Sequence, residues 1–279
     1  MKPPPFEYVR PSTLGEAVEQ LASAGDDAKL LAGGQSLVPL LNFRLAAPNL
    51  LVDLNGVAEL SFVEAGSDQL RIGAMTRTRT LEVSPEVAKA NPLLASAAGW
   101  IGHVQIRNRG TVGGSLAHAD PSAELPALCV LLDARIVVTG PKGNRTVGAD
   151  KFFKGLMSTA LEHDEVLTEV TIPNLPGQAR WGFREFAQRH GDFAVAGAAC
   201  VVQQDAARLV VFGVADAPLR CTSAERELAR DGGGKTETVV EALRDDLARV
   251  DGSPQRAYQR RVAEAMVAGA VQDARGRGR

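Results

Sequence analysis

The chain has 279 residues, of which 45% are hydrophobic and 23% are charged. This composition is typical of a folded globular protein and excludes a disordered or fibrous one, and the length accommodates one or two domains. Lys and Arg together number 31 against 33 Asp and Glu, a formal net charge of −2 that argues against a broad basic surface for nucleic acid.

The first 32 residues predict a strand, a helix and a second strand. Residues 14–22 carry apolar side chains at helical spacing behind Thr13-Leu14-Gly15-Glu16, which has capping-box spacing, and Gly25 ends the run. The short runs 6–9 and 29–32 on either side have strand character. A crossover helix between them favours a parallel pair.

Residues 50–172 mix strand and helix signals. The predicted strands are residues 50–54, 60–64, 69–73, 134–139 and 165–172. The turn-forming Gly66-Ser67-Asp68 makes a hairpin of the second and third of these strands. Residues 81–100 predict helices that begin at Pro85 and Pro92, because proline is favoured in the first turn of a helix.

Residues 174–177, Asn-Leu-Pro-Gly, form the densest cluster of turn residues, and we place a domain boundary there. Three strands beyond it predict an antiparallel meander: residues 183–188, 194–203 and 208–214. Three helices follow, at residues 223–230, 237–249 and 254–272, with breaks at the glycines 232–234 and 252. We expect the terminal Arg-Gly-Arg-Gly-Arg to be a disordered tail.

A glycine pair near the N-terminus indicates an anion-binding loop. In residues 30–39, Leu-Leu-Ala-Gly-Gly-Gln-Ser-Leu-Val-Pro, an apolar strand ends in Gly33-Gly34, and Ser36 follows in position to cap a short helix. Paired glycines let backbone amides converge on a phosphate, and a helix N-terminus adds partial positive charge. A lone glycine pair is nevertheless more often a simple tight turn.

A second pair, in Thr111-Val112-Gly113-Gly114-Ser115, repeats the pattern of a β-branched residue, two glycines and a serine. Two such loops are able to hold one diphosphate from both sides. Neither loop matches the dinucleotide fingerprint or the nucleotide-triphosphate loop, which disfavours a Rossmann fold and a nucleotide triphosphatase.

These segments resemble the FAD-binding subunits of molybdenum hydroxylases, a family that includes carbon monoxide dehydrogenase medium subunits and the xanthine dehydrogenase flavin domain. The resemblance rests on Ala32-Gly33-Gly34-Gln35-Ser36-Leu37 and on residues 111–121, Thr-Val-Gly-Gly-Ser-Leu-Ala-His-Ala-Asp-Pro. It extends over nearly the whole chain, through residues 172–173 and 188–194 to Tyr258-Gln259-Arg260-Arg261.

The resemblance implies an α+β fold of the vanillyl-alcohol oxidase (PCMH) type. Two α+β subdomains, about residues 1–56 and 57–177, would clasp FAD. Residues 178–279 would form a C-terminal medium-subunit domain of an antiparallel sheet and a helix bundle. The meander and helices predicted for these last residues agree with it independently.

By the same resemblance, the FAD diphosphate lies between residues 30–37 and 111–115, with the amides of both glycine pairs as donors. The cofactor-binding residues of the two loops are Leu30, Leu31, Ala32, Gly33, Gly34, Gln35, Ser36, Leu37, Thr111, Val112, Gly113, Gly114 and Ser115. We expect that valine at Gly34 or Gly114 would fill the space of the diphosphate and abolish FAD retention.

Asp120 and Glu124 follow the second loop, and carboxylates are acceptors suited to sugar hydroxyls. The resemblance favours Glu124 for the adenosine ribose and Asp120 for the ribityl side. Asp120 alternatively caps a helix that begins at Pro121.

Four further positions match family residues near the cofactor. Ile101 and Leu167 would line the site or be plain core. Arg184 would stabilise reduced, anionic flavin or form a solvent salt bridge. Phe193, where some relatives have Tyr, would stack on the isoalloxazine ring. His118 lies inside the second motif, but we expect no covalent linkage, so the FAD is noncovalent.

The cysteines and histidines indicate no metal in this chain. Cys129, Cys200 and Cys221 are odd in number and lie among small or apolar residues, which predicts buried free thiols. The four histidines show no metal-ligand spacing: His103, His118, His163 and His190.

The resemblance implies an electron-relay subunit with no catalytic residue of its own. A large partner would carry the molybdopterin cofactor and a small partner two [2Fe-2S] clusters, in a dimer of heterotrimers, and an external acceptor would take the electrons. Since no apolar stretch reaches the length of a spanning helix, we expect a cytoplasmic protein. The alternatives are a stand-alone FAD reductase of the same fold and a non-catalytic diphosphate-binding protein.

Overall fold

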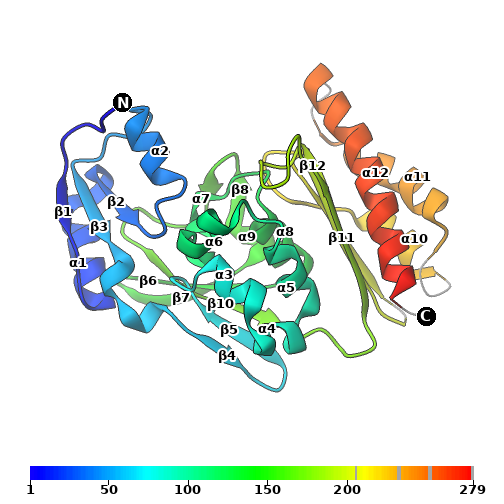
Figure 1. Cartoon of the computed structure of the whole chain (residues 1–279), viewed down its shortest axis with the longest axis horizontal. Coiled ribbons are helices and arrows are strands. Elements are labelled where there is room, and N and C mark those ends of the chain that lie inside the picture. The colour runs from blue at the N-terminus through cyan, green and yellow to red at the C-terminus, as the bar shows by residue number, and fades with distance from the viewer. Residues whose placement is uncertain (205, 231–233, 251–252, 278–279) are drawn as a thin grey trace.

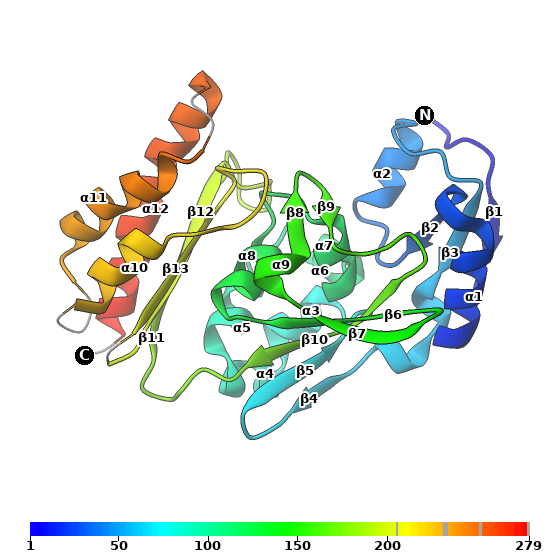
Figure 2. The same cartoon turned by 180° about the vertical axis from the view of Figure 1, so that it is seen from behind.

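The computed structural model describes residues 1–204, 206–230, 234–250 and 253–277. The three larger β-sheets, each associated with helices, follow one another along the longest axis of the molecule (Figure 1). The view from behind shows the same order, with the N-terminal sheet at one end and the C-terminal helices at the other (Figure 2). No helix in the described part of the chain combines the length and apolar character needed to cross a membrane.

The N-terminal sheet has three parallel strands in the order β1-β3-β2: β1 (Glu7–Val9), β3 (Leu50–Asp53) and β2 (Ala28–Leu31). Helix α1 (Leu14–Ala24) connects β1 to β2, with the Thr13 hydroxyl accepting from the Glu16 amide. The parallel direction predicted for the outer strands is confirmed, but they do not pair with each other. The more apolar β3 takes the central place, because a central strand buries more of its surface than an edge strand.

The middle sheet has five antiparallel strands in the order β4-β5-β10-β6-β7: β4 (Val63–Ala65), β5 (Gln69–Gly73), β10 (Val166–Pro173), β6 (Arg135–Gly140) and β7 (Gly143–Gly148). The predicted hairpin is confirmed as β4 and β5. Strand β7 and the small pair β8 (Phe153–Gly155) and β9 (Ser158–Thr159) were not predicted from the sequence. Strand β7 is polar and exposed, so only its pairing with β6 makes it a strand.

Seven short helices accompany this sheet: α3 (Thr78–Val83), α4 (Pro85–Ala90), α5 (Pro92–Ala98), α6 (Val104–Arg109), α7 (Val112–His118), α8 (Glu124–Leu131) and α9 (Ala149–Phe152). The predicted starts at Pro85 and Pro92 are confirmed, with Ser84 and Asn91 as side-chain caps. The remaining short elements are α2 (Leu37–Asn42) and the 3-10 turns Gly25–Asp27, Leu54–Gly56 and Ala58–Leu60.

The C-terminal sheet is the predicted antiparallel meander: β11 (Arg180–Phe186), β12 (Ala196–Val202), β13 (Ala207–Phe212) and the short β14 (Leu219–Arg220). Helices α10 (Thr222–Ala229) and α12 (Pro254–Gly276) pack against one face, and α11 (Thr236–Leu247) packs on these two helices (Figure 1). Every residue of β12 is buried, because α12 covers one face of the sheet and α8 the other.

The prediction of a disordered tail is wrong for its first three residues. Helix α12 continues to Gly276, and the Arg277 guanidinium lies 3.5 Å from the centre of the Trp181 ring. Arg277 also donates to the Trp181 carbonyl oxygen at 2.6 Å. This cation–π contact with the neighbouring strand β11 orders the chain end. The tail residues 278–279 and the predicted glycine breaks at 232–233 and 252 lie outside the described residues.

Candidate cofactor site at two glycine loops

The structure brings the two glycine pairs into contact. We call residues 30–37 the first glycine loop and residues 111–115 the second. A Cβ added to Gly33 would lie 2.3 Å from the carbonyl oxygen of Arg109, directly before the second loop. A Cβ added to Gly114 would lie 3.4 Å from the Cβ of Ala32. Segments almost eighty positions apart in the sequence thus meet backbone to backbone.

In the first glycine loop the backbone is free to bind an anion. Gly34 has a φ of +74°, which favours glycine. Within the described part of the chain, the amides of Gly33 and Gly34 have no hydrogen-bond acceptor. Ser36 precedes α2 as predicted, but its side chain makes no capping hydrogen bond. The loop therefore offers unpaired amide donors, as a diphosphate site requires.

The second glycine loop differs from the prediction. Thr111 caps α7 by accepting from the Gly114 amide at 3.1 Å, and the Gly113 amide donates to the Ala74 carbonyl at 2.8 Å. The expectation that all four glycine amides are free donors is therefore wrong for Gly113 and Gly114. The capping side chain of Thr111 occupies the Gly114 amide, and the backbone just after β5 occupies the Gly113 amide.

Valine at Gly34 or Gly114 would meet the protein itself before it meets a diphosphate, contrary to the prediction. A Cβ at Gly113 would lie 2.5 Å from the Ala74 Cβ, and one at Gly114 would lie 2.7 Å from the Thr111 hydroxyl oxygen. A Cβ at Gly34 would meet the Val38 side chain at 3.1 Å. These glycines are required by close packing within the protein, so valine would first distort the loops themselves.

A hydrogen-bond network missed by the sequence analysis lies under the junction of the loops. Asn55 donates to the Ala32 carbonyl at 2.9 Å and accepts from the Arg77 guanidinium at 2.6 Å. Arg77 also donates to the Arg109 carbonyl at 2.6 Å. Asn55 also donates to Asp53. Asp53 ends β3 and Asn55 lies in the turn that follows, next to the end of β2. Polar residues at the end of a strand are the sequence signal that could have identified this network.

Two shifted pKa values accompany this network. Burial raises the pKa of Asp53, but the hydrogen bonds from Tyr8 and Asn55 outweigh burial and hold it below its ordinary value. Burial lowers the pKa of Arg77, and the neighbouring charge of Arg109 lowers it further. The Arg77 guanidinium donates to two neutral oxygens, and the nearby Asp53 carboxylate partly offsets the lowering of its pKa through its charge alone.

Asp120 and Glu124 lie at different places relative to α8. Asp120 accepts from the Ser122 amide at 2.8 Å in a local turn, and α8 begins at Glu124 rather than at Pro121. The predicted alternative, a helix capped by Asp120, is therefore wrong, because residues 121–123 form a turn before the helix starts.

Glu124 is buried and faces Glu185 of β11, a residue that the sequence analysis missed. Burial raises the pKa of Glu124 to about 7, with a smaller contribution from the charge of Asp120. Burial and the charge of Glu124 raise the pKa of Glu185 to about 8. Near neutral pH the two carboxyl groups therefore share a proton.

Three other predicted site residues lie in or near the central core. Leu167 is a buried core residue of β10, paired with Val138, as the plain alternative stated. Ile101 is half-buried against the same core, in the segment before α6. His118 is half-buried at the last position of α7.

Arg184 and Phe193 have different surroundings. Arg184 forms a two-point ion pair with Asp273 of α12, at 2.8 Å for each bond, on the face of the sheet that α12 covers. This is the salt-bridge alternative, and we therefore leave Arg184 out of the site. Phe193 lies in the loop before β12 with 69% of its surface exposed, so its ring is available to another group.

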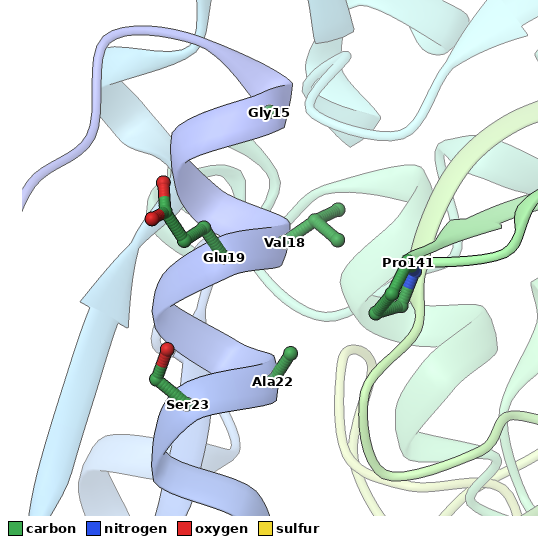
Figure 3. Close-up of a pocket in the computed structure, with 6 residues that line it drawn as sticks. All are labelled: Gly15, Val18, Glu19, Ala22, Ser23 and Pro141. Atoms are coloured by element: carbon green, nitrogen blue, oxygen red, sulfur yellow. The ribbon is translucent and has the colours of Figure 1, made fainter.

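Two shallow surface depressions lie outside both loops. One, of about 420 Å³, separates α1 from Pro141, with Val18 and Ala22 pointing across it (Figure 3). The other, of about 450 Å³, is lined by residues 102–105, Arg107 and His190. The His190 imidazole and the Trp100 ring lie nearly perpendicular, with the centres 5.5 Å apart.

The cysteines behave as predicted. All three are free and buried, and burial raises the pKa of Cys129 and Cys200 to about 12 and that of Cys221 well above its ordinary value. Among the residues that the structure describes, no three His, Cys, Asp or Glu side chains gather in a way that suits a metal ion. That this chain binds no metal stays a prediction.

Residues 4–175 match the family described as the FAD-binding domain in molybdopterin dehydrogenase. The match covers both glycine loops and more than half of the chain. The chain belongs to this family. The donor set agrees with an FAD diphosphate, because the first glycine loop offers unpaired amides and the Arg77 guanidinium lies beside the junction of the loops.

Relatives of this flavin-domain family resemble the chain over almost its full length. The α subunit of the 6-hydroxypseudooxynicotine dehydrogenase complex of Paenarthrobacter nicotinovorans is 41% identical, over 96% of this chain and 93% of the relative. A solved carbon monoxide dehydrogenase chain from Hydrogenophaga pseudoflava has a TM-score of 0.93 at 39% identity, over 99% of each chain. A chain of quinoline 2-oxidoreductase from Pseudomonas putida 86 has a TM-score of 0.90 at 36% identity, over the whole of each chain. The predicted α+β FAD-binding fold is confirmed.

Proposed function

We propose that this chain is the FAD-binding, electron-transfer subunit of a heteromeric molybdenum hydroxylase. The observation that carries the proposal is the junction of the two glycine loops, where Gly33 contacts the backbone before the second loop. Membership of the flavin-domain family and the subunit names of the relatives support it. Bound FAD would accept electrons and release them to an acceptor, and the protein would hold and orient it.

We propose that the FAD is noncovalent and that its diphosphate lies along the first glycine loop. The free amides of Gly33 and Gly34 would donate to it, and Thr111 would hold the second loop in place by capping α7. Because Gly113 and Gly114 donate within the protein, we assign them a packing role beside the diphosphate.

We propose Glu124 for the adenosine ribose and Asp120 for the ribityl side. Carboxyl groups suit the hydroxyl donors of a sugar, and the Glu124 side chain is fixed by burial at the start of α8. Ile101, His118 and Phe193 would line the remaining cofactor surface, with the exposed Phe193 ring stacked on the isoalloxazine.

We further propose that the subunit works in the cytoplasm with two partners, a large molybdopterin-binding subunit and a small [2Fe-2S] subunit, in a dimer of heterotrimers. Electrons from the small partner would reach the FAD and leave to an external acceptor. Within the chain, residues 1–177 would form the FAD-binding domain and residues 178–279 a C-terminal domain. The passage from β10 to β11 at residues 174–179 supports this division.

The test combines cofactor analysis with purification of the complex. Full-length protein should bind FAD in a one-to-one ratio, the flavin should be released by acid, and the isolated chain should show no substrate turnover. Expressed together with its genomic neighbours, the tagged chain should co-purify with subunits that contain molybdenum and iron. A colourless chain that stays colourless after FAD is added would contradict the proposal, and turnover by the isolated chain would support a stand-alone reductase instead.

A further inference from the structure

Asn55 connects the first glycine loop to the turn after β3. Its side-chain amide nitrogen donates to the Ala32 carbonyl and to the Asp53 carboxylate, and its amide oxygen accepts from Arg77. This orientation satisfies all three contacts, whereas the reverse would place the amide oxygen against two other oxygens. The position therefore needs a side chain that both donates and accepts.

The contact with Ala32 determines the direction of the Gly33 amide. Ala32 C=O and Gly33 N–H belong to one planar trans peptide, in which the two groups point in opposite directions. Since Asn55 holds the carbonyl from the protein side, the Gly33 N–H is directed away from Asn55. That amide has no acceptor in the described part of the chain.

Arg77 connects the same network to the second glycine loop. One guanidinium nitrogen donates to Asn55 and the other to the Arg109 carbonyl, which is the atom that lies against Gly33. Arg77 also pairs with Thr111 in an isolated antiparallel bridge. The planar guanidinium presents a separate nitrogen to each oxygen at 2.6 Å, whereas lysine has a single nitrogen and is not equivalent here.

We propose that Asn55 and Arg77 are positioning residues of the cofactor site, which clamp the two glycine loops together and aim the Gly33 amide at the FAD diphosphate. The inference rests on the proposed function, because it requires that the loops hold a diphosphate. Arg77 also places a positive charge beside the loops, and this charge favours an anionic group there.

The test uses the full-length chain and two conservative variants, Asn55→Asp and Arg77→Lys. Asn55→Asp keeps the shape but replaces the donor by an oxygen that repels Ala32 and Asp53. Arg77→Lys keeps the charge but replaces two fixed donor nitrogens by one. We expect each variant to raise the Kd for FAD on the order of tenfold or more, measured by flavin fluorescence.

Phosphorus NMR of FAD at saturating protein gives a readout that a general loss of stability does not change. We expect the diphosphate resonances to shift in both variants relative to wild type. A Kd within about twofold of wild type together with unchanged phosphorus resonances would overturn the clamp. Full affinity in Arg77→Lys alone would overturn it as well, since charge would then suffice.

Arg71→Lys is the matched control. Arg71 forms a two-point pair with Glu169 on the exposed face of the middle sheet and touches neither glycine loop. We expect this variant to bind FAD like wild type, and a loss equal to that of Arg77→Lys would overturn the clamp. Failure of the wild-type chain itself to bind FAD would instead reject the proposed function, so the two failures are distinguishable.

Discussion

In a β-strand successive side chains point to opposite faces of the sheet, and this alternation decides which partner Arg184 contacts. Its neighbours Phe183 and Glu185 face α8 and the central core, so Arg184 points to the other face of β11. There it pairs with Asp273 of α12. A sequence match to a basic family position did not reveal this direction, because the register of β11 is set by its pairing with β12.

We predict that Arg184→Ala leaves FAD binding unchanged. The ion pair is partly exposed, with 49% and 24% of the two side chains accessible, so its loss should lower the free energy of unfolding by less than about 1 kcal/mol. Flavin titration and urea unfolding of the variant check the two statements. A clear loss of FAD affinity would return Arg184 to the cofactor site.

At the scale of elements, glycines of the same chain differ in whether the fold leaves room for a side chain. Gly33 has no room for a Cβ because the backbone before the second loop lies against it, whereas a Cβ on Gly15 in α1 would meet nothing within 4 Å. Glycine patterns in the sequence alone do not separate these cases, since the neighbour that excludes a side chain comes from a distant segment.

We predict opposite effects for alanine at these two positions. Gly33→Ala should separate the loops and lose FAD, because its Cβ would overlap the Arg109 carbonyl oxygen. Gly15→Ala should raise the free energy of unfolding by about 0.5–1 kcal/mol, since alanine is the better helix former. Thermal unfolding with and without FAD measures both, and normal FAD binding by Gly33→Ala would contradict the proposed contact of the loops.

At the scale of the whole molecule, the Glu124–Glu185 pair joins α8 to the C-terminal sheet. The core itself is continuous here, because Phe183 and Phe212 pack into the same cluster as the helices of the FAD-binding part. Both carboxyl groups have pKa values raised by burial, to about 7 and about 8. The proton that they share therefore lies where α8 contacts the C-terminal sheet.

This pair predicts that the protein loses stability as the pH rises from acid to about 8. The folded state binds protons more tightly than the unfolded state, whose carboxyl groups titrate near 4.5. The stabilising contribution is complete below that pH and is lost as the pH rises through about 7 to 8. Each kcal/mol lost should lower the Tm by about 2–4 °C.

The variant Glu185→Gln tests this prediction, because glutamine stays neutral and can still donate to Glu124. Melting temperatures should be recorded in FAD-free protein from pH 6 to pH 9. We expect wild type to lose more stability across this range than the variant does. An identical pH dependence of the two proteins would show that the pair does not share a proton.

Local sequence signals predicted much of the secondary structure. Thr13, Pro85 and Pro92 each mark a helix start that the structure confirms, because capping and proline geometry act within one turn of chain. The exposed strand β7 and the ordered Arg277 were not predictable in this way. Each is held by a partner strand or ring rather than by its own residues.

The sequence by itself determined the family, the α+β class, the burial of the three cysteines and the position of both glycine loops, since each depends on local residue pattern. Only the tertiary structure decided which glycine amides are free and why a side chain has no room at Gly33. It also showed that Asn55 and Arg77 contact the loops and that Glu185 pairs with Glu124. These properties depend on contacts between segments far apart in the chain. No local pattern records such contacts, because the folded packing creates them.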